Sequence, residues 1–179
     1  MWPGCTVPGC GRPFSATAEV ATLTELDGRL HLDFVGTEVE LLRNLLVRVS
    51  DLLAEDADPA TGAPADPVLA RLLPDAHRDD PVVAATQREL TEAGLREDKR
   101  ADIGAVMAAL PAETGSAVIV DPDAWLRALN DMRLMLGVEL GITEDTEPPR
   151  SVSDPRELQL AVYFWLTHLQ DRLVEAVLG

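Results

Sequence analysis

Apolar and polar residues alternate with a period of two near the N-terminus, and a helical period takes over further along the chain. Over residues 29–34 the alternation gives one apolar and one polar strand face. This segment and residues 18–26 flank Asp27-Gly28, a preferred pair for a type I′ turn. The pattern therefore predicts an N-terminal β-hairpin.

A first helix is predicted to begin at Thr37 and to end near Asp56. Thr37 and Glu40 have the spacing of a capping box, in which the two side chains bond each other's backbone N–H groups. Apolar residues then recur at alternating spacings of three and four, which places them on one face of the helix: Val39, Leu42, Leu46, Val49 and Leu53.

Asp-Pro pairs predict the starts of later helices. The Asp side chain accepts hydrogen bonds from the backbone N–H groups of the first turn, which have no partner within the helix. Proline at the first helical position lacks an N–H, so no helical hydrogen bond is lost there. The pairs stand at Asp66, Asp80, Asp121 and Asp154. The corresponding helical segments are 68–73, 82–110 with a break or kink near Gly94, 123–140 with Gly141 as its stop, and 155–178. A β-branched apolar run at 117–120 predicts a short buried strand.

These elements predict a mainly α fold, a helical bundle with a small N-terminal β-hairpin to which 117–120 can add a third strand. We expect a flexible tail at 1–14, rich in Gly, Pro and Cys, followed by a single α-helical domain over 15–179. The polar Pro/Ala/Gly segment 56–66 is predicted to be a mobile loop within that domain.

The chain is acidic, with a formal charge of −16 from 31 Asp and Glu against 15 Lys and Arg. This charge disfavours a nucleic-acid partner, which requires a basic surface. No apolar run long enough for a membrane helix and no signal-peptide pattern is present, so we expect a cytoplasmic protein without a membrane partner. The two cysteines, Cys5 and Cys10, are interpreted as reduced thiols in the tail.

Known catalytic motifs are absent from the sequence, which has no P-loop, dinucleotide fingerprint, zincin motif or nucleophile elbow. The histidines His31, His77 and His168 fall in three different predicted elements. We therefore predict no catalytic residue, no cofactor and no metal site.

The predicted helix 123–140 carries polar residues beside its apolar face. Trp125 lies on that face and Arg133 lies at its edge, with Asn130 and Asp131 close by in sequence. One interpretation is structural, with Arg133 tied to a carboxylate or to helix-end carbonyls. The other is functional, with Arg133 as an anion-binding residue in a pocket. We favour the structural interpretation.

The last predicted helix is apolar on two sides, so it lies at the centre of the bundle or contributes to an oligomer interface such as a homodimer. Trp165 on its main face is interpreted as core, and Gln170 follows one turn later. The charged segment 88–100, with the chain's one lysine, and the pair Asp123/Arg127 predict solvated, ion-paired surfaces.

Three segments resemble a known family. They are Trp125–Gly137 (WLRALNDMRLMLG) followed by Gly141-Ile142, Tyr163–Thr167 (YFWLT) followed by Leu169-Gln170, and Arg88–Glu92 (RELTE) with the nearby Lys99. They resemble the actinobacterial family catalogued as domain of unknown function two-thousand-and-seventeen. Its members are often encoded beside the adaptor of the Clp protease, so the resemblance implies a regulatory or proteolysis-linked interaction role.

The sequence is therefore consistent with three functions. The first is a non-catalytic regulatory or protein-interaction domain linked to regulated proteolysis, with a protein partner. The second is a transcriptional regulator with a winged-helix-like layout, which would need a basic recognition face. The third is an enzyme with a polar site around Asn130, Asp131 and Arg133. We favour the first, and the structural or interaction cluster predicted to serve it comprises Trp125, Asn130, Asp131, Arg133, Trp165 and Gln170.

Overall fold

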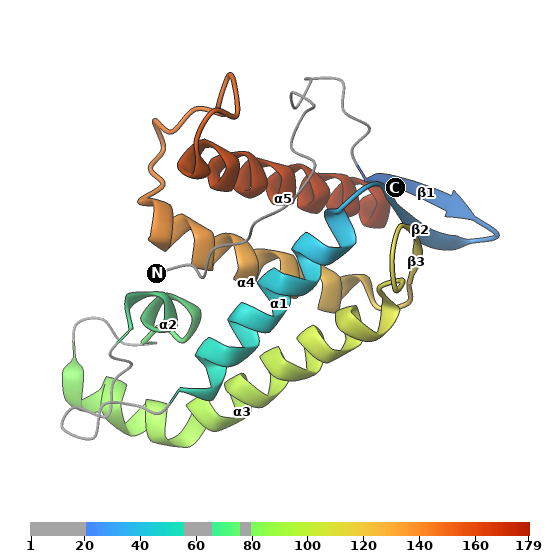
Figure 1. Ribbon diagram of the computed structural model, residues 1–179. Coiled ribbons are helices and arrows are strands. Elements are labelled where there is room, and N and C mark those ends of the chain that lie inside the picture. Colours follow the sequence, from blue (N-terminus) through green and yellow to red (C-terminus); the bar gives the residue numbers. More distant parts are fainter. Residues whose placement is uncertain (1–20, 56–65, 76–79) are drawn as a thin grey trace.

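A computed structural model describes residues 21–55, 66–75 and 80–179. Figure 1 shows a helical bundle with a small sheet at one end, beside the C-terminal end of α5. The elements are β1 (Thr22–Leu26), β2 (Arg29–Phe34), α1 (Glu38–Ala54), α2 (Pro67–Leu72), α3 (Pro81–Ala109), β3 (Gly115–Ile119), α4 (Pro122–Leu140) and α5 (Pro155–Leu178). The predicted fold class, mainly α with a small sheet, is confirmed.

The predicted hairpin joins a third strand to form an antiparallel sheet in the order β1-β2-β3. Asp27 and Gly28 both have positive φ, 51° and 71°, as a type I′ turn requires. Leu32 at the centre of β2 lies opposite Leu23 of β1 and Ala117 of β3. Leu32 and Ala117 are buried, so the sheet contributes its apolar face to the core.

The Asp-Pro pairs begin helices as predicted. The carboxylate of Asp66 accepts hydrogen bonds from the backbone N–H groups of Val68 and Leu69, at 2.7 and 3.1 Å. The aspartates before α3 and α5 also accept two such bonds each, and Asp121 before α4 accepts one, from the backbone N–H of Ala124. Gly141 ends α4 in the left-handed conformation, with φ 64°, so this local chemistry fixes the ends of α4.

The predicted capping box at the start of α1 is wrong. The Thr37 side chain makes no capping hydrogen bond. Glu38 instead accepts bonds from the backbone N–H groups of Val35, at 2.9 Å, and Ala21, at 3.1 Å. Because Ala21 lies just before β1, the Glu38 carboxylate joins the sheet to the first helix, and this tertiary contact replaces the local cap.

We expect Glu38→Ala to lower the free energy of unfolding by about 1–2 kcal/mol, because it leaves two backbone donors without their acceptor. Glu40→Ala is the matched control, since Glu40 is exposed and would matter only if the capping box existed. Urea unfolding of both variants measures the difference. Equal losses, or a larger loss for Glu40→Ala, would contradict the assignment.

The chain is not interrupted near Gly94, since α3 is a single helix from Pro81 to Ala109, and of the predicted break or kink only the break is excluded. Glycine inside a helix costs about 1 kcal/mol relative to alanine. Here the side chains of Glu92 and Arg96 bridge the glycine with a 2.9 Å hydrogen bond. The same helix packs on α1 and α4, and these contacts offset the local preference.

Helix α4 occupies the centre of the bundle, where it packs on α1, α2, α3 and α5. It contributes much of the buried core, including Trp125, Met132 and Leu136. Helix α5 packs mainly on α4 and leaves apolar side chains exposed near its two ends, at Leu158, Val174, Val177 and Leu178. The central position predicted as one alternative for the last helix therefore belongs to α4.

The predicted tail at 1–14 and nearly all of the predicted loop at 56–66 lie outside the described residues. The expected division into a flexible tail and one helical domain therefore stays a prediction.

Candidate functional site

Polar side chains of α4 point to two different neighbours of that helix. Asp131 bonds to Lys99 of α3, while Arg133 bonds to Gln170 of α5. Trp125, one of the six residues of the predicted cluster, is only 2% exposed and lies in the core. The predicted cluster is thus divided among the α3 interface, the α5 interface and the core.

A buried ion pair joins α4 to α3. Lys99 Nζ lies 2.7 and 2.9 Å from the two carboxylate oxygens of Asp131, and the Asp131 side chain is 3% exposed. Burial raises the pKa of Asp131 above its ordinary value, and the bond from Lys99 opposes that rise. About one helical turn further along α3, the Asp102 carboxylate accepts two hydrogen bonds from Arg127 of α4. The Nε donates at 2.7 Å and the Nη2 at 2.8 Å.

These two pairs correct two sequence interpretations. Arg127 bonds to Asp102 across the α3–α4 interface, whereas the sequence predicted a surface pair with Asp123. Lys99, assigned to a solvated face, is partly buried against Asp131. The reason in both cases is that α3 and α4 pack side by side, which offers a fixed partner close to each charge.

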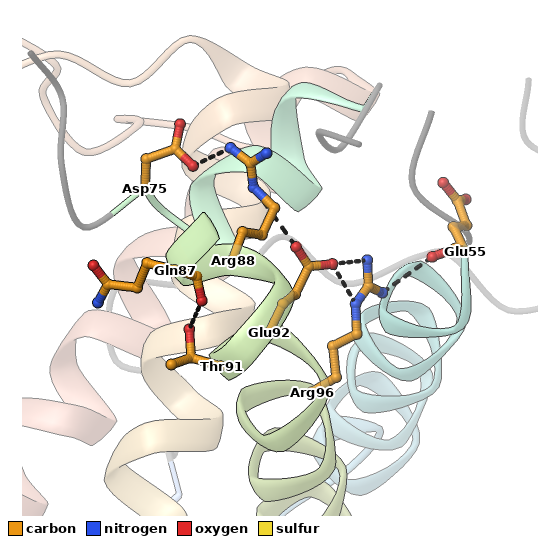
Figure 2. Close-up of polar contacts among 7 residues, drawn as sticks. All are labelled: Glu55, Asp75, Gln87, Arg88, Thr91, Glu92 and Arg96. Atoms are coloured by element: carbon orange, nitrogen blue, oxygen red, sulfur yellow. Dashed lines mark hydrogen bonds and ion pairs between the residues drawn. The ribbon is translucent and has the colours of Figure 1, made fainter. Parts of the chain in front are cut away.

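Alternating charges run along the first half of α3. Figure 2 shows Arg88 between Asp75 and Glu92, and Arg96 between Glu92 and the backbone carbonyl of Glu55. The Arg96 guanidinium lies 2.8 Å from Glu92 and 3.0 Å from the Glu55 carbonyl oxygen, just past the end of α1. Because a cation is favoured at a helix C-terminus, this row of charges has a structural role in joining α1 and α3.

Arg133 is held on the other side of α4 by two residues of α5. Its Nη1 donates to Gln170 Oε1, and its guanidinium carbon lies 5.6 Å from the centre of the Tyr163 ring, a cation–π distance. Its Nε is buried and has no hydrogen-bond partner among the described residues. Neither a carboxylate nor a helix-end carbonyl bonds Arg133 there, so its partners differ from those that the sequence interpretation expected.

Arg133 also lines a pocket open to the surface, with a volume of about 380 Å³. We call this the Arg133 pocket. Its lining comes from α2, α4, the segment just after α4, and α5, and comprises Arg71, Asn130, Arg133, Leu134, Gly137, Val138, Gly141, Ile142 and Tyr163. Asp131 is not part of it, so the three residues of the enzyme hypothesis do not share one pocket.

Sequence reasoning missed Arg71 and Tyr163 as members of this pocket. A signal existed for Tyr163, because it precedes Gln170 by seven residues, which places both on one face of a helix. No local signal marks Arg71, whose position depends on how α2 packs against α4. Trp165, also in the predicted cluster, is partly buried, and its indole N–H is buried with no partner among the described residues.

Within the described part of the chain, no group of three or more His, Cys, Asp or Glu side chains is placed to hold a metal ion. Among the described helices, none carries the long uncharged apolar run that a membrane crossing requires.

Comparison with known proteins gives matches along nearly the whole chain. The chain is 30% identical to the proteins named oxidative stress regulator AosR of Mycobacterium tuberculosis (strain H37Rv) and Mycobacterium bovis, over 96% of this chain and 98% of each relative. It is 29% identical to the putative oxidative stress regulator AosR of Mycobacterium leprae, over 96% of this chain and 99% of that relative.

No solved structure matches the chain. The model of the family described as domain of unknown function (DUF2017) matches residues 17–177. The match includes all three segments on which the resemblance rested. The chain therefore belongs to the DUF2017 family.

Proposed function

We propose that this chain is a regulator of the response to oxidative stress and that it acts by binding another protein. The observation that carries the proposal is the match to relatives named oxidative stress regulators over 96% of the chain. A match of this extent, including the buried helices, supports a common architecture and a related role. The expected link to regulated proteolysis is the finer part of the proposal.

The C-terminal end of α5 is the surface that we propose for the partner. Val174, Val177 and Leu178 are 37%, 45% and 80% exposed there. An amphipathic helix that leaves apolar side chains in water is typical of a docking surface. The exposed carboxylates of Asp171 and Glu175 lie next to these valines in the sequence, and the whole chain is acidic, so a partner with a basic surface is favoured.

The test uses a strain in which the gene is deleted and complemented. We expect the deletion strain to survive hydrogen peroxide less well than the parent, and the wild-type gene to restore survival. Val174→Asp/Val177→Asp should fail to restore it and should lose the protein that co-purifies with the wild-type chain. Val47→Asp is the matched control, because Val47 is a 43% exposed valine on α1.

Unchanged peroxide survival in the deletion strain would contradict the regulatory role. Co-purification of the Clp protease or its adaptor would support the link to proteolysis, and its absence would remove that link.

Light scattering on the purified chain tests the homodimer. A dimer that Val174→Asp/Val177→Asp converts to a monomer would assign the α5 surface to a second copy instead of a different protein. Retardation of DNA at low salt would favour the transcriptional alternative.

The oxidative signal is tested on the two cysteines, Cys5 and Cys10, which lie outside the described residues. Thiols are the side chains that peroxide oxidises reversibly with the greatest ease. We expect peroxide treatment to change the amount of partner captured by the wild-type chain and to leave capture by Cys5→Ser/Cys10→Ser unchanged. An equal response of both proteins would place the oxidant-sensitive step elsewhere.

A further inference from the structure

The charged side chains that line the Arg133 pocket are cationic, although the chain as a whole is acidic. The chain has a net charge of −16, yet the residues that line this pocket include Arg71 and Arg133 and no Asp or Glu. Asn130 adds an amide, which can donate hydrogen bonds, and Tyr163 adds a phenol. The pocket therefore combines two guanidinium groups with neutral polar groups, a composition suited to an anion.

Arg133 is fixed in position without a counter-ion among the described residues. Gln170 accepts a bond from its Nη1, and the Tyr163 ring lies beneath its guanidinium. Neither Arg133 nor Arg71 forms an ion pair within the described part of the chain. By contrast, Arg96 and Arg127 are matched with carboxylates. A partly buried guanidinium held by neutral groups retains its attraction for an anion, and its fixed position lowers the entropy lost on binding.

The rest of the pocket wall is apolar. Leu134 and Val138 of α4 and Ile142 just after it supply aliphatic surface, and Gly137 projects no side chain into the space between them and Tyr163. The volume of about 380 Å³ falls within the range of small-molecule sites. A ligand that satisfies both parts of the wall has a charged oxyanion head and a short apolar body.

We propose that the Arg133 pocket binds a small organic anion whose carboxylate or phosphate head contacts Arg71 and Arg133. Guanidinium groups match both heads with paired N–H···O bonds, so the two chemistries share one recognition mode. The apolar body lies against Leu134, Val138 and Ile142. This site is separate from the exposed α5 valines and does not depend on the partner proposed above.

The test is an NMR titration of the full ¹⁵N-labelled chain, observed at the arginine Nε–Hε signals. The probes are sodium phosphate, sodium isobutyrate and sodium acetate, with sodium chloride at equal ionic strength as the reference. We expect a saturable shift of the Arg133 signal. Saturation by phosphate alone assigns a phosphate head, and saturation by isobutyrate at lower concentration than acetate assigns a carboxylate head with an apolar body.

Variants connect the binding to the pocket. Arg133→Gln and Arg71→Gln, each observed at the Nε–Hε signal of the arginine that remains in the pocket, should weaken binding at least about tenfold, the effect expected for loss of a charge-assisted contact. Arg71 is exposed, so its variant tests the pocket even if Arg133→Gln unfolds the chain. Arg133→Lys should restore binding in part, because it keeps the charge and loses the planar fork. Arg172→Gln, at an exposed arginine of α5, should leave the affinity unchanged.

The proposal is overturned if no probe produces a saturable shift, or if chloride shifts the Arg133 signal as much as the oxyanions do. It is overturned equally if Arg71→Gln and Arg172→Gln bind the probes as well as the wild-type chain.

Discussion

Lys99→Met is expected to lower the free energy of unfolding by about 3 kcal/mol at neutral pH, or roughly 6–12 °C in Tm for a chain of this size. The substitution keeps the aliphatic length of the side chain and removes the charge that faces Asp131. Asp131 then remains 3% exposed with neither of its two bonds from Lys99 Nζ, at 2.7 and 2.9 Å. A buried carboxylate without its counter-ion is among the more costly defects in a protein core.

The size of this loss should depend on pH. Burial already raises the folded-state pKa of Asp131 above its ordinary value of 3.8, and removal of Lys99 removes an opposing influence, so the pKa in the variant rises further. A raised folded-state pKa means that the folded state binds the proton more tightly than the unfolded state. The stabilising effect of protonation is therefore present at low pH and is lost as pH rises through the folded-state pKa. We expect the difference between wild type and Lys99→Met to widen as pH rises.

Urea unfolding between about pH 5.5 and pH 8 measures this dependence. Lys99→Met/Asp131→Asn is the informative double variant, since it removes both charges. It should recover most of the loss and should abolish its pH dependence. Arg172→Met is the control for loss of an exposed pair with Glu175, and it should cost less than about 0.5 kcal/mol. A loss in Lys99→Met no larger than in this control would contradict the role of the buried pair.

The same pair shows which features the sequence could predict. Asp66 and Gly141 were assigned correctly because capping chemistry acts between residues a few positions apart. Lys99 and Asp131 are 32 residues apart, and their contact exists only because α3 packs against α4. The error at Glu38 has the same origin, since one of its two partners, Ala21, is 17 residues away.

For the candidate site too, the sequence identified individual residues but not the pocket that they form. The helical period placed Arg133 at the edge of the apolar face, and the structure finds it partly buried at the rim between α4 and α5. Gln170 was named in the predicted cluster and accepts the bond from Arg133. The pocket forms only because α2 packs against α4 and brings Arg71 close to it. Helix α2 has six residues, which is too short for its hydrophobic pattern to predict the helix against which it packs.

Trp125→Ala is expected to lower the free energy of unfolding by about 3–5 kcal/mol, the largest loss among the substitutions considered. Trp125 is 2% exposed and belongs to the hydrophobic core, so its removal leaves a large cavity that the packed side chains around it cannot fill. From the sequence, the predicted cluster that contains Trp125 could be either structural or an interaction surface. A loss of this size, measured by urea unfolding with an unchanged m-value, assigns Trp125 to the core.

Trp165→Phe is the matched comparison and should behave in the opposite way. The Trp165 indole N–H is buried without a hydrogen-bond partner among the described residues, so its presence already carries the penalty of an unpaired donor. Phenylalanine keeps an aromatic ring and removes that donor, and the two effects should leave stability within about 1 kcal/mol of the wild type. If Trp165→Phe instead costs as much as Trp125→Ala, the indole N–H has a partner, and the α5 side of the cluster is a bonded polar site instead of packing surface.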